Sequence, residues 1–331
     1  MRFIYKFTFL LFSVLLAAGT FAWWWSGQPL KLSQSPVDFH IAAGSSLRAA
    51  INQIRAAGID VQPNLMALVA RLQGAERGIK AGSYSVETGV TARELLDKLI
   101  SGKVTQSDLT LVEGKTFSQW RSRLDAHPDL THDTLGLTET QIIKQLGLNT
   151  PSLEGWLYPD TYFFDKHSSD LALLARAVRA MQAKLNSEWA QRAANLPYKT
   201  PYEALIMASI VEKETGRDAD RGLVAAVFVN RLRKGMLLQT DPTVIYGMGD
   251  HFDGNLRKGD LQTDTPYNTY LRVGLPPTPI AMPGLASLHA ALNPAPSDVL
   301  YFVARGDGSS EFSRTLPEHN NAVNLYQRRG K

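Results

Sequence analysis

Two glutamates at the end of an apolar segment are the residues best suited to acid–base chemistry. Glu212 and Glu214 follow a run of mostly apolar residues, 204–211. A carboxyl group in apolar surroundings has a raised pKa and acts as a general acid near neutral pH. On a helix, side chains two positions apart point about 200° apart around the axis. Glu212 and Glu214 therefore cannot both face one cleft. Glu214 continues the bulkier apolar row, which favours it as the acid. Solvated charges at a helix end are the competing interpretation.

The segment 200–216 predicts the helix that positions these carboxyl groups. Thr200 is a suitable N-cap, Pro201 suits the first helical position, and Glu203 completes a capping box with Thr200. Gly216 is expected to end the helix in a left-handed conformation. A helix that is apolar on all sides belongs inside a protein, so we expect this one to be buried.

Three later segments, 237–249, 264–270 and 274–280, combine small polar and aromatic residues with bracketing Gly and Pro. They predict rigid loops that present amide and hydroxyl groups, which suits a neutral, hydroxyl-rich ligand. An earlier segment, 153–164, holds five aromatic residues with one Asp and one Glu. It predicts either a small aromatic core or a wall on which sugar rings stack.

Composition limits the class of protein. The chain has 331 residues, of which 44% are hydrophobic and 20% are charged, so it is globular and long enough for about two domains. The net charge is only +4 and no long Lys/Arg run occurs, so nucleic acid is not an expected partner. Cysteine is absent, which excludes disulfides, thiolate metal sites and a cysteine nucleophile.

Other catalytic chemistries find little support. A serine acyl-enzyme of the Ser-x-x-Lys type would need a lysine three residues after its serine, but the residue three after Ser209 is Glu212. The Lys-Thr-Gly motif of such enzymes does not occur either. The seven histidines are scattered, and no His-Glu-x-x-His motif is present. We therefore expect neither a metal site nor a cofactor.

The N-terminal region predicts a membrane anchor. Residues 7–25 carry no charge, and nineteen residues are about enough to cross the hydrocarbon core. Arg2 and Lys6 precede the run, which predicts that residues 1–6 are cytoplasmic, and tryptophans at 23–25 suit the far interface. A cleaved signal peptide is the alternative. In either case residues 26–331 lie outside the cytoplasm, with 26–36 as a linker.

The rest of the chain predicts an α+β fold in two domains. Residues 37–105 read as strand, helix, helix, strand and helix, which resembles a LysM-like subdomain or, alternatively, a generic small α+β module. Residues 106–331 form a larger domain of helices and short sheets. Its expected elements are a strand at 109–112, helices at 138–147, 169–195 and 219–234, and a hairpin at 299–313.

Several motifs agree in order and spacing with one known family. They lie at 208–214, 238–247 and 267–270, and also at 154–156, 159–162, 274–277 and 301–304. On these motifs the chain closely resembles the endolytic murein transglycosylases of the MltG/YceG-like family, along nearly its whole length and including the N-terminal anchor.

The resemblance implies an enzyme that cuts nascent peptidoglycan strands internally, at the β-1,4 bond between MurNAc and GlcNAc. It would leave 1,6-anhydro-MurNAc ends and so terminate strand elongation. It implies one essential Glu, assigned to Glu214 with Glu212 as the fallback. Residues expected to hold the sugars or tune the acid are Gln239, Thr240, Asp241, Tyr246, Asn268, Tyr270 and Glu212. Asp241 has a competing role as the cap of its own Asp-Pro turn.

The resemblance also implies a location and partners. The chain is expected in the inner membrane as a single-pass protein, with a cytoplasmic N-terminus and a periplasmic catalytic domain. Peptidoglycan strands are the expected substrate, the membrane is contacted through residues 7–25, and peptidoglycan synthases are candidate partners. The alternative function is a membrane-anchored peptidoglycan-binding scaffold without catalysis.

Overall fold

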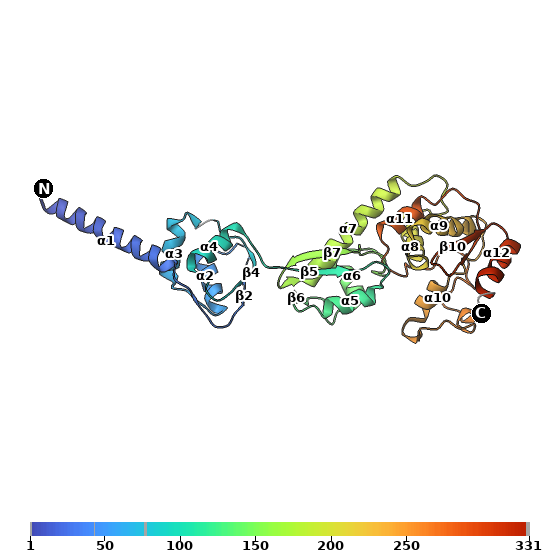
Figure 1. Ribbon diagram of the computed structural model, residues 1–331, viewed down its shortest axis with the longest axis horizontal. Coiled ribbons are helices and arrows are strands. Elements are labelled where there is room, and N and C mark those ends of the chain that lie inside the picture. Colours follow the sequence, from blue (N-terminus) through green and yellow to red (C-terminus); the bar gives the residue numbers. More distant parts are fainter. Residues whose placement is uncertain (1, 43, 76–77, 329–331) are drawn as a thin grey trace. The chain divides into compact units, whose positions relative to one another are not determined.

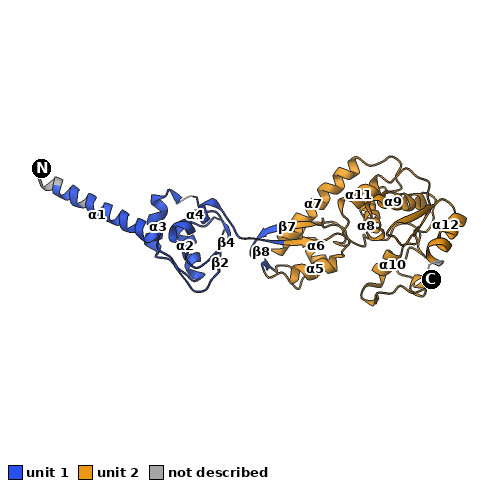
Figure 2. Ribbon diagram, viewed as in Figure 1, with its two compact units in different colours: residues 1–108, 129–131, 163–168 blue, residues 109–128, 132–162, 169–331 orange. Residues whose placement is uncertain are grey.

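The computed structural model describes residues 2–42, 44–75 and 78–328 and divides the chain into two units (Figures 1 and 2). Unit 1 comprises residues 1–108, 129–131 and 163–168, and unit 2 comprises the remainder. Each unit is a mixture of helices and two-stranded sheets. The predicted α+β class is therefore confirmed.

Unit 1 is built around the antiparallel pair β2 (Val37–Ile41) and β4 (Gly82–Val86), with Phe39 opposite Tyr84. Strand β2 alternates buried and exposed residues, so one of its faces packs on the core. The other elements of this region are β1 (Lys31–Leu32), α2 (Leu47–Ala56), β3 (Ile59–Asp60), α3 (Pro63–Leu72) and α4 (Ala92–Ser101). The five predicted strands and helices are present in the predicted order, with the short strand β3 as an unpredicted addition between α2 and α3. The LysM-like assignment stays a prediction.

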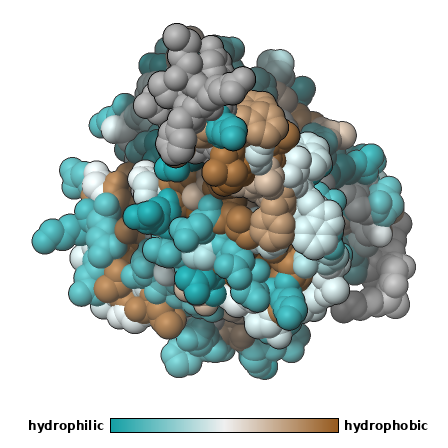
Figure 3. Space-filling model, turned by 90° about the vertical axis from the view of Figure 1, so that its left-hand side faces the viewer, coloured by the Kyte–Doolittle hydropathy of each residue, from teal (hydrophilic) through white to brown (hydrophobic). Residues whose placement is uncertain are grey.

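Helix α1 (Arg2–Ser26) contains the segment predicted as a membrane anchor. Its described side chains are mostly exposed and apolar, with Phe9 73% and Trp24 61% exposed. Figure 3, which looks at the left-hand side of Figure 1, shows hydrophobic residues gathered on this face of the molecule. Over the described part of the chain, however, no helix combines the length and the apolar character needed to cross a membrane. The predicted membrane-spanning helix is thus not confirmed.

Unit 2 contains most of the helices. In chain order its elements are α5 (Phe117–Asp125), α6 (Glu139–Gln145), α7 (Asp170–Ala190), α8 (Pro201–Glu214), α9 (Asp218–Arg233), α10 (Asp241–Met248), α11 (Leu285–Leu292), β9 (Tyr301–Ala304), β10 (Ser310–Ser313) and α12 (Leu316–Val323). The pair β5 (Gln106–Leu111) and β7 (Asp160–Asp165) belongs partly to each unit, and β6 (Leu130–Thr131) pairs with β8 (Ser168–Ser169).

Helix α8 lies at the centre of unit 2, where it packs against α7, α9, α10 and α11 (Figure 1). Every residue from 204 to 211 is buried, as the all-round apolar sequence predicts. The Thr200–Glu203 capping box and Pro201 at the first turn are both present. These signals together fix the start of the helix and hence the place of Glu214 at its end.

The helix does not end as predicted. Thr215 is the C-cap with extended backbone (φ −145°), and Gly216 is not among the residues with positive φ. The Thr215 hydroxyl instead accepts a hydrogen bond from the backbone N–H of Arg217 at 3.0 Å. A side-chain turn thus replaces the expected left-handed glycine, which was a wrong prediction.

Three further differences concern the helices of unit 2. Helix α7 ends at Ala190, five residues before the predicted end at 195. The segment 237–249 is not only loop, because α10 occupies most of it. Helix α12 was not predicted, although the C-terminal hairpin is confirmed, with Phe302 opposite Phe312.

Candidate active site

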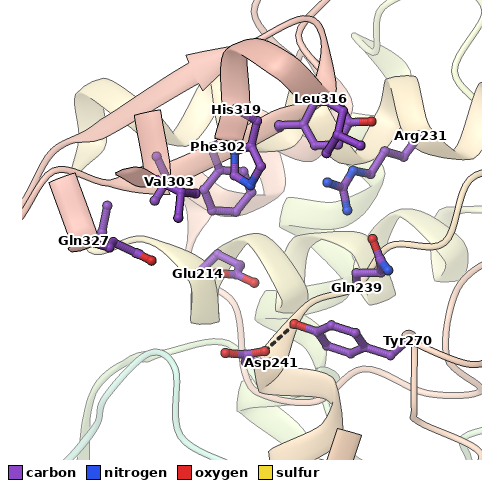
Figure 4. Close-up of a pocket in the computed structure, with 13 residues that line it drawn as sticks. Glu214, Arg231, Gln239, Asp241, Tyr270, Phe302, Val303, Leu316, His319 and Gln327 are labelled. Atoms are coloured by element: carbon purple, nitrogen blue, oxygen red, sulfur yellow. Dashed lines mark hydrogen bonds between the residues drawn. The ribbon is translucent and has the colours of Figure 1, made fainter. Parts of the chain in front are cut away.

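A cavity of about 450 Å³ lies in unit 2 at the C-terminal end of α8 (Figure 4). Its walls come from α8, α9, the start of α10, the strand β9 and the C-terminal helices. The residues that line it are Glu214, Arg231, Gln239, Asp241, Tyr270, Tyr301, Phe302, Val303, Ala304, Leu316, His319, Val323 and Gln327. Polar groups and aromatic rings thus surround one carboxyl group at the end of a buried helix.

Glu214 is the last residue of α8, and its side chain is half-buried. The pKa of this carboxyl is raised to about 7, chiefly by burial, and the charge of Asp241 acts in the same direction. Two groups oppose this shift: the Thr240 hydroxyl, which donates a hydrogen bond to Glu214 Oε1, and the charge of Arg231. A carboxyl with such a pKa exchanges a proton readily near neutral pH.

The segment before α10 is held in an unusual conformation. Gln239 has φ 49°, in the left-handed region that is uncommon for a residue with a Cβ. Its N–H donates to the Thr269 carbonyl at 3.0 Å, and the N–H of Thr240 donates to Thr269 Oγ1 at 3.1 Å. Thr243 Oγ1 and Thr269 Oγ1 lie 2.8 Å apart. This buried threonine network fixes the hydroxyl that contacts Glu214.

Asp241 and Tyr270 form the second polar pair of the cavity. The Tyr270 hydroxyl donates to Asp241 Oδ1 at 2.5 Å (Figure 4), and burial raises the pKa of Tyr270. Thr240, rather than Asp241, is the N-cap of α10, and the side chain of Thr240 makes no capping bond. Asp241 therefore does not cap an Asp-Pro turn of its own, which was the competing prediction.

Asn268 lies behind Tyr270 rather than in the cavity. It is fully buried, and its Nδ2 donates to the carbonyls of Leu261 at 3.1 Å and Thr263 at 2.8 Å. Its Oδ1 accepts the N–H of Tyr270 at 2.9 Å. The structure thus gives Asn268 the geometry of a support for Tyr270.

Glu212 points away from the cavity. Its Oε2 accepts a hydrogen bond from the N–H of Gly284 at 3.0 Å. Glu113 lies near it, and its pKa is raised by burial and by the charge of Glu212. Of the two glutamates that the sequence left open, only Glu214 is among the described residues that line the cavity.

Tyr246 also lies outside the cavity lining. Its hydroxyl donates to Glu154 Oε2 at 3.1 Å, and its ring packs edge-on against Tyr267 with centroids 4.8 Å apart. Glu154 is buried, and both of its oxygens accept the N–H of Phe117 at 3.1 Å. Burial raises the pKa of Glu154 to about 8, so this carboxyl is mostly uncharged at neutral pH.

Sequence reasoning missed Arg231, a buried cation in the wall of the cavity. Its Nε donates to the Leu300 carbonyl and its Nη1 to the Leu238 carbonyl, both at 2.7 Å. Its guanidinium lies 5.3 Å from the centre of the Tyr301 ring. Arg231 thus links Leu238, the residue before Gln239, to Leu300, the residue before β9. An arginine two residues after the apolar run 223–229 of α9 was the available signal.

The wall formed by α12 was also missed. Leu316 and His319 of this helix line the cavity, and burial followed by the charge of Arg231 lowers the pKa of His319. A Thr315–Glu318 capping box begins the helix and is visible in the sequence. This Thr-x-x-Glu spacing was the signal that would have revealed the wall.

The described residues offer little for metal binding. In the described ranges, no three His, Asp or Glu side chains gather into a group that would hold a metal ion. The cavity instead offers one carboxyl with a neutral-range pKa, hydroxyl and amide groups, and aromatic rings. That set suits proton transfer to a polar, uncharged ligand.

Comparison with known proteins gives consistent matches. The sequence model of the YceG-like family matches residues 39–325. The chain is 34% identical over 315 residues to the endolytic murein transglycosylase of Bacillus subtilis, covering 89% of this chain and 86% of that protein. It is 27% identical to the endolytic murein transglycosylase of Streptococcus pneumoniae strain D39, covering 96% of this chain but only 64% of that protein.

A solved structure shares the fold. A crystal structure of a yceG-like protein from Listeria monocytogenes superposes with a TM-score of 0.56 and is 33% identical. The match covers 87% of this chain and 99% of the Listeria chain. Sequence and fold comparisons therefore point to the same family over most of the chain.

Proposed function

This chain belongs to the YceG-like family, and we propose that it is an endolytic murein transglycosylase that cuts peptidoglycan strands. The observation that carries the proposal is Glu214, whose pKa is raised to about 7 in a cavity lined by hydroxyl, amide and aromatic groups. A general acid works best when its pKa lies near the working pH.

The proposed bond is the β-1,4 linkage between MurNAc and GlcNAc within a nascent strand. Glu214 donates its proton to the glycosidic oxygen while the bond from that oxygen to C1 of MurNAc breaks. The 6-hydroxyl of the same MurNAc then attacks C1, and Glu214 takes the proton of that hydroxyl. The products are a GlcNAc 4-hydroxyl and a 1,6-anhydro-MurNAc end, with no water consumed.

One carboxyl is enough for this reaction. Hydrolytic glycosidases use a pair of carboxylates, the second of which activates water or acts as a nucleophile. Here the nucleophile belongs to the substrate, and its attack is intramolecular, which supplies a high effective concentration. The other carboxyl in the cavity, Asp241, is held by Tyr270, and its charge supports the raised pKa of Glu214.

The first experiment is a digest of uncrosslinked glycan strands, with the products weighed by mass spectrometry. We expect fragments lighter by one water than hydrolysis products, and no fragments with Glu214→Gln. Glu212→Gln is the matched control, because Glu212 lies on the same helix outside the cavity lining. Fragments that contain added water would indicate a hydrolase, with Asp241 as the first candidate for the second carboxylate.

A non-catalytic peptidoglycan-binding scaffold is the alternative from another class. A scaffold has no use for a carboxyl whose pKa matches neutral pH inside a cavity. Absence of any cleavage by the wild-type chain, with glycan binding retained by both wild type and Glu214→Gln, would favour the scaffold.

We also propose that the protein is held at the inner membrane through residues 7–25, with the catalytic domain in the periplasm and peptidoglycan synthases as partners. The uncharged run and the preceding Arg2 and Lys6 support this topology. Protease treatment of intact spheroplasts checks it: residues 26–331 should be degraded from outside. Protection of that region would overturn the topology.

A further inference from the structure

A second cavity, of about 570 Å³, lies in unit 2 at the opposite end of α8 from Glu214. Thr200 and Tyr202 of the first turn of α8, Gln182 and Asn186 of α7, and Trp156 are among its lining residues. Helix α8 has 14 residues. At 1.5 Å per residue, this cavity is about 20 Å from the catalytic carboxyl along the helix.

The aromatic part of this cavity comes from the segment 153–164. The rings of Trp156 and Tyr202 stack with centroids 5.8 Å apart and planes at 12°. The indole N–H of Trp156 donates to Thr150 Oγ1 at 2.9 Å, which fixes the orientation of the ring. Both rings are half-buried rather than enclosed in the core. The segment is thus a wall of a cavity at this point, not a small aromatic core.

The polar part of the cavity is uncharged. None of its described lining residues is Asp, Glu, Lys, Arg or His. The side-chain amides of Gln182 and Asn186 make no hydrogen bond to the described protein and so are available to a ligand. Flat aromatic surface beside amide and hydroxyl groups is the complement of a neutral sugar ring, which has an apolar face and polar edges.

We propose that this cavity is a distal glycan subsite that binds a neutral N-acetylated sugar ring of the strand being cut. The proposal rests on the proposed function for its substrate class. In a strand of alternating sugars, the ring without an acidic substituent is GlcNAc, which fits an uncharged lining. A subsite about 20 Å from Glu214 engages only strands several sugars long, and so favours cutting away from strand ends.

The binding test uses the full chain with Glu214→Gln, so that no ligand is consumed. The probe is the β-1,4-linked tetramer of N-acetylglucosamine, with affinity measured by calorimetry. Losing the hydrogen bonds of two amides in Gln182→Ala/Asn186→Ala is expected to weaken binding roughly tenfold. Ser187→Ala, an exposed change on the same helix outside the cavity lining, is the control and should leave the affinity unchanged.

The aromatic contribution is tested with a pair of variants. Trp156→Ala should weaken tetramer binding, while Trp156→Phe should keep most of it, because a ring remains in the wall. Circular dichroism of both variants checks that unit 2 is folded. If the double amide variant binds the tetramer as tightly as the Ser187→Ala control, or if the parent chain does not bind it at all, the subsite is overturned.

The kinetic test uses the chain with Glu214 intact. The double amide variant should raise KM for long glycan strands roughly tenfold, and it should leave kcat and the cleavage of short strands unchanged. An unchanged KM for long strands would overturn the subsite while leaving the proposed reaction intact. If the wild type cleaves nothing, the proposed reaction fails, and the tetramer measurement still decides whether this cavity binds sugar.

Discussion

Glu214 shows how the surroundings of one residue set its chemistry. Burial raises its pKa to about 7, and two neighbours act in opposite directions. Thr240 donates a hydrogen bond that favours the carboxylate, whereas the negative charge of Asp241 favours the protonated acid. Since the proposed reaction begins with proton donation, its rate should fall as pH rises through about 7.

The two neighbours give a paired prediction. Thr240→Val removes the hydrogen bond, so the pKa of Glu214 should rise and the alkaline limb of the kcat profile should move up by about one pH unit. Asp241→Asn removes the charge, so the same limb should move down. Measured pH–rate profiles of strand cleavage check both. If the alkaline limb moved in the same direction in Thr240→Val and in Asp241→Asn, this account of Glu214 would be contradicted.

Glu154 gives a prediction about stability. Its pKa is raised from 4.5 to about 8, so the folded state holds this proton more tightly than the unfolded state. The resulting stability is fully present below pH 4.5 and is lost as pH rises through about 8. The loss is of the order of 3–5 kcal/mol.

Glu154→Gln should remove this pH dependence, because an amide does not ionise. Denaturant unfolding of the wild type and the variant between pH 5 and pH 8 measures the difference. Glu87→Gln, at an exposed glutamate, is the control and should behave like the wild type. A wild-type stability that stays level over this range would contradict the assigned burial.

At the scale of elements, the candidate site is assembled from helix ends and one strand. Helix α8 supplies Glu214 at its C-terminus, and α10 begins with the Asp241 that faces it. Strand β9 and helix α12 supply the opposite wall. Arg231 of α9 connects these parts through its bonds to two backbone carbonyls. The site therefore depends on how these ends are held, as well as on the residues they carry.

The contribution of α12 to the active site can be tested by breaking the capping box of this helix. Thr315→Ala removes the hydrogen bond to the N–H of Glu318 and should destabilise α12 by about 1 kcal/mol. Strand cleavage should fall, because Leu316 and His319 line the cavity. Thr138→Ala, which breaks the same motif at α6, should lose similar stability and keep its activity. Equal activity of the two variants would show that α12 is not part of the working site.

At the scale of the whole molecule, the positions of the two cavities indicate which unit carries the cleavage activity. Every described residue that lines either cavity belongs to unit 2. Unit 1 has its own core around β2 and β4, and its LysM-like character is a prediction from the element order. Strand cleavage should therefore reside in unit 2, while unit 1 contributes binding or placement.

A fragment of residues 103–331 tests this division, because it keeps the β5–β7 pair and both cavities. It should cleave short glycan strands with the kcat of the full chain. If unit 1 binds glycan, KM for long strands should be higher for the fragment. A folded fragment without any cleavage would assign a catalytic contribution to unit 1.

Local sequence signals account for much of this arrangement. The capping box at Thr200, the buried course of α8, the terminal hairpin and the α+β class rest on local signals, which operate between residues a few positions apart. The pairing of Glu214 with Gln239, Thr240, Asp241 and Tyr270 was expected only from resemblance to a family, and the fold brings all five together.

Tertiary structure decided the rest, because direction and burial depend on contacts between distant segments. The sequence favoured Glu214 and kept Glu212 as the fallback, and packing turns Glu214 toward the cavity and Glu212 toward Gly284. Burial by separate segments also made Glu154 a mostly uncharged partner of Tyr246 and made Arg231 a structural link across the site. No local pattern encodes these outcomes, because the hydrogen bonds that carry them join residues 26 to 92 positions apart.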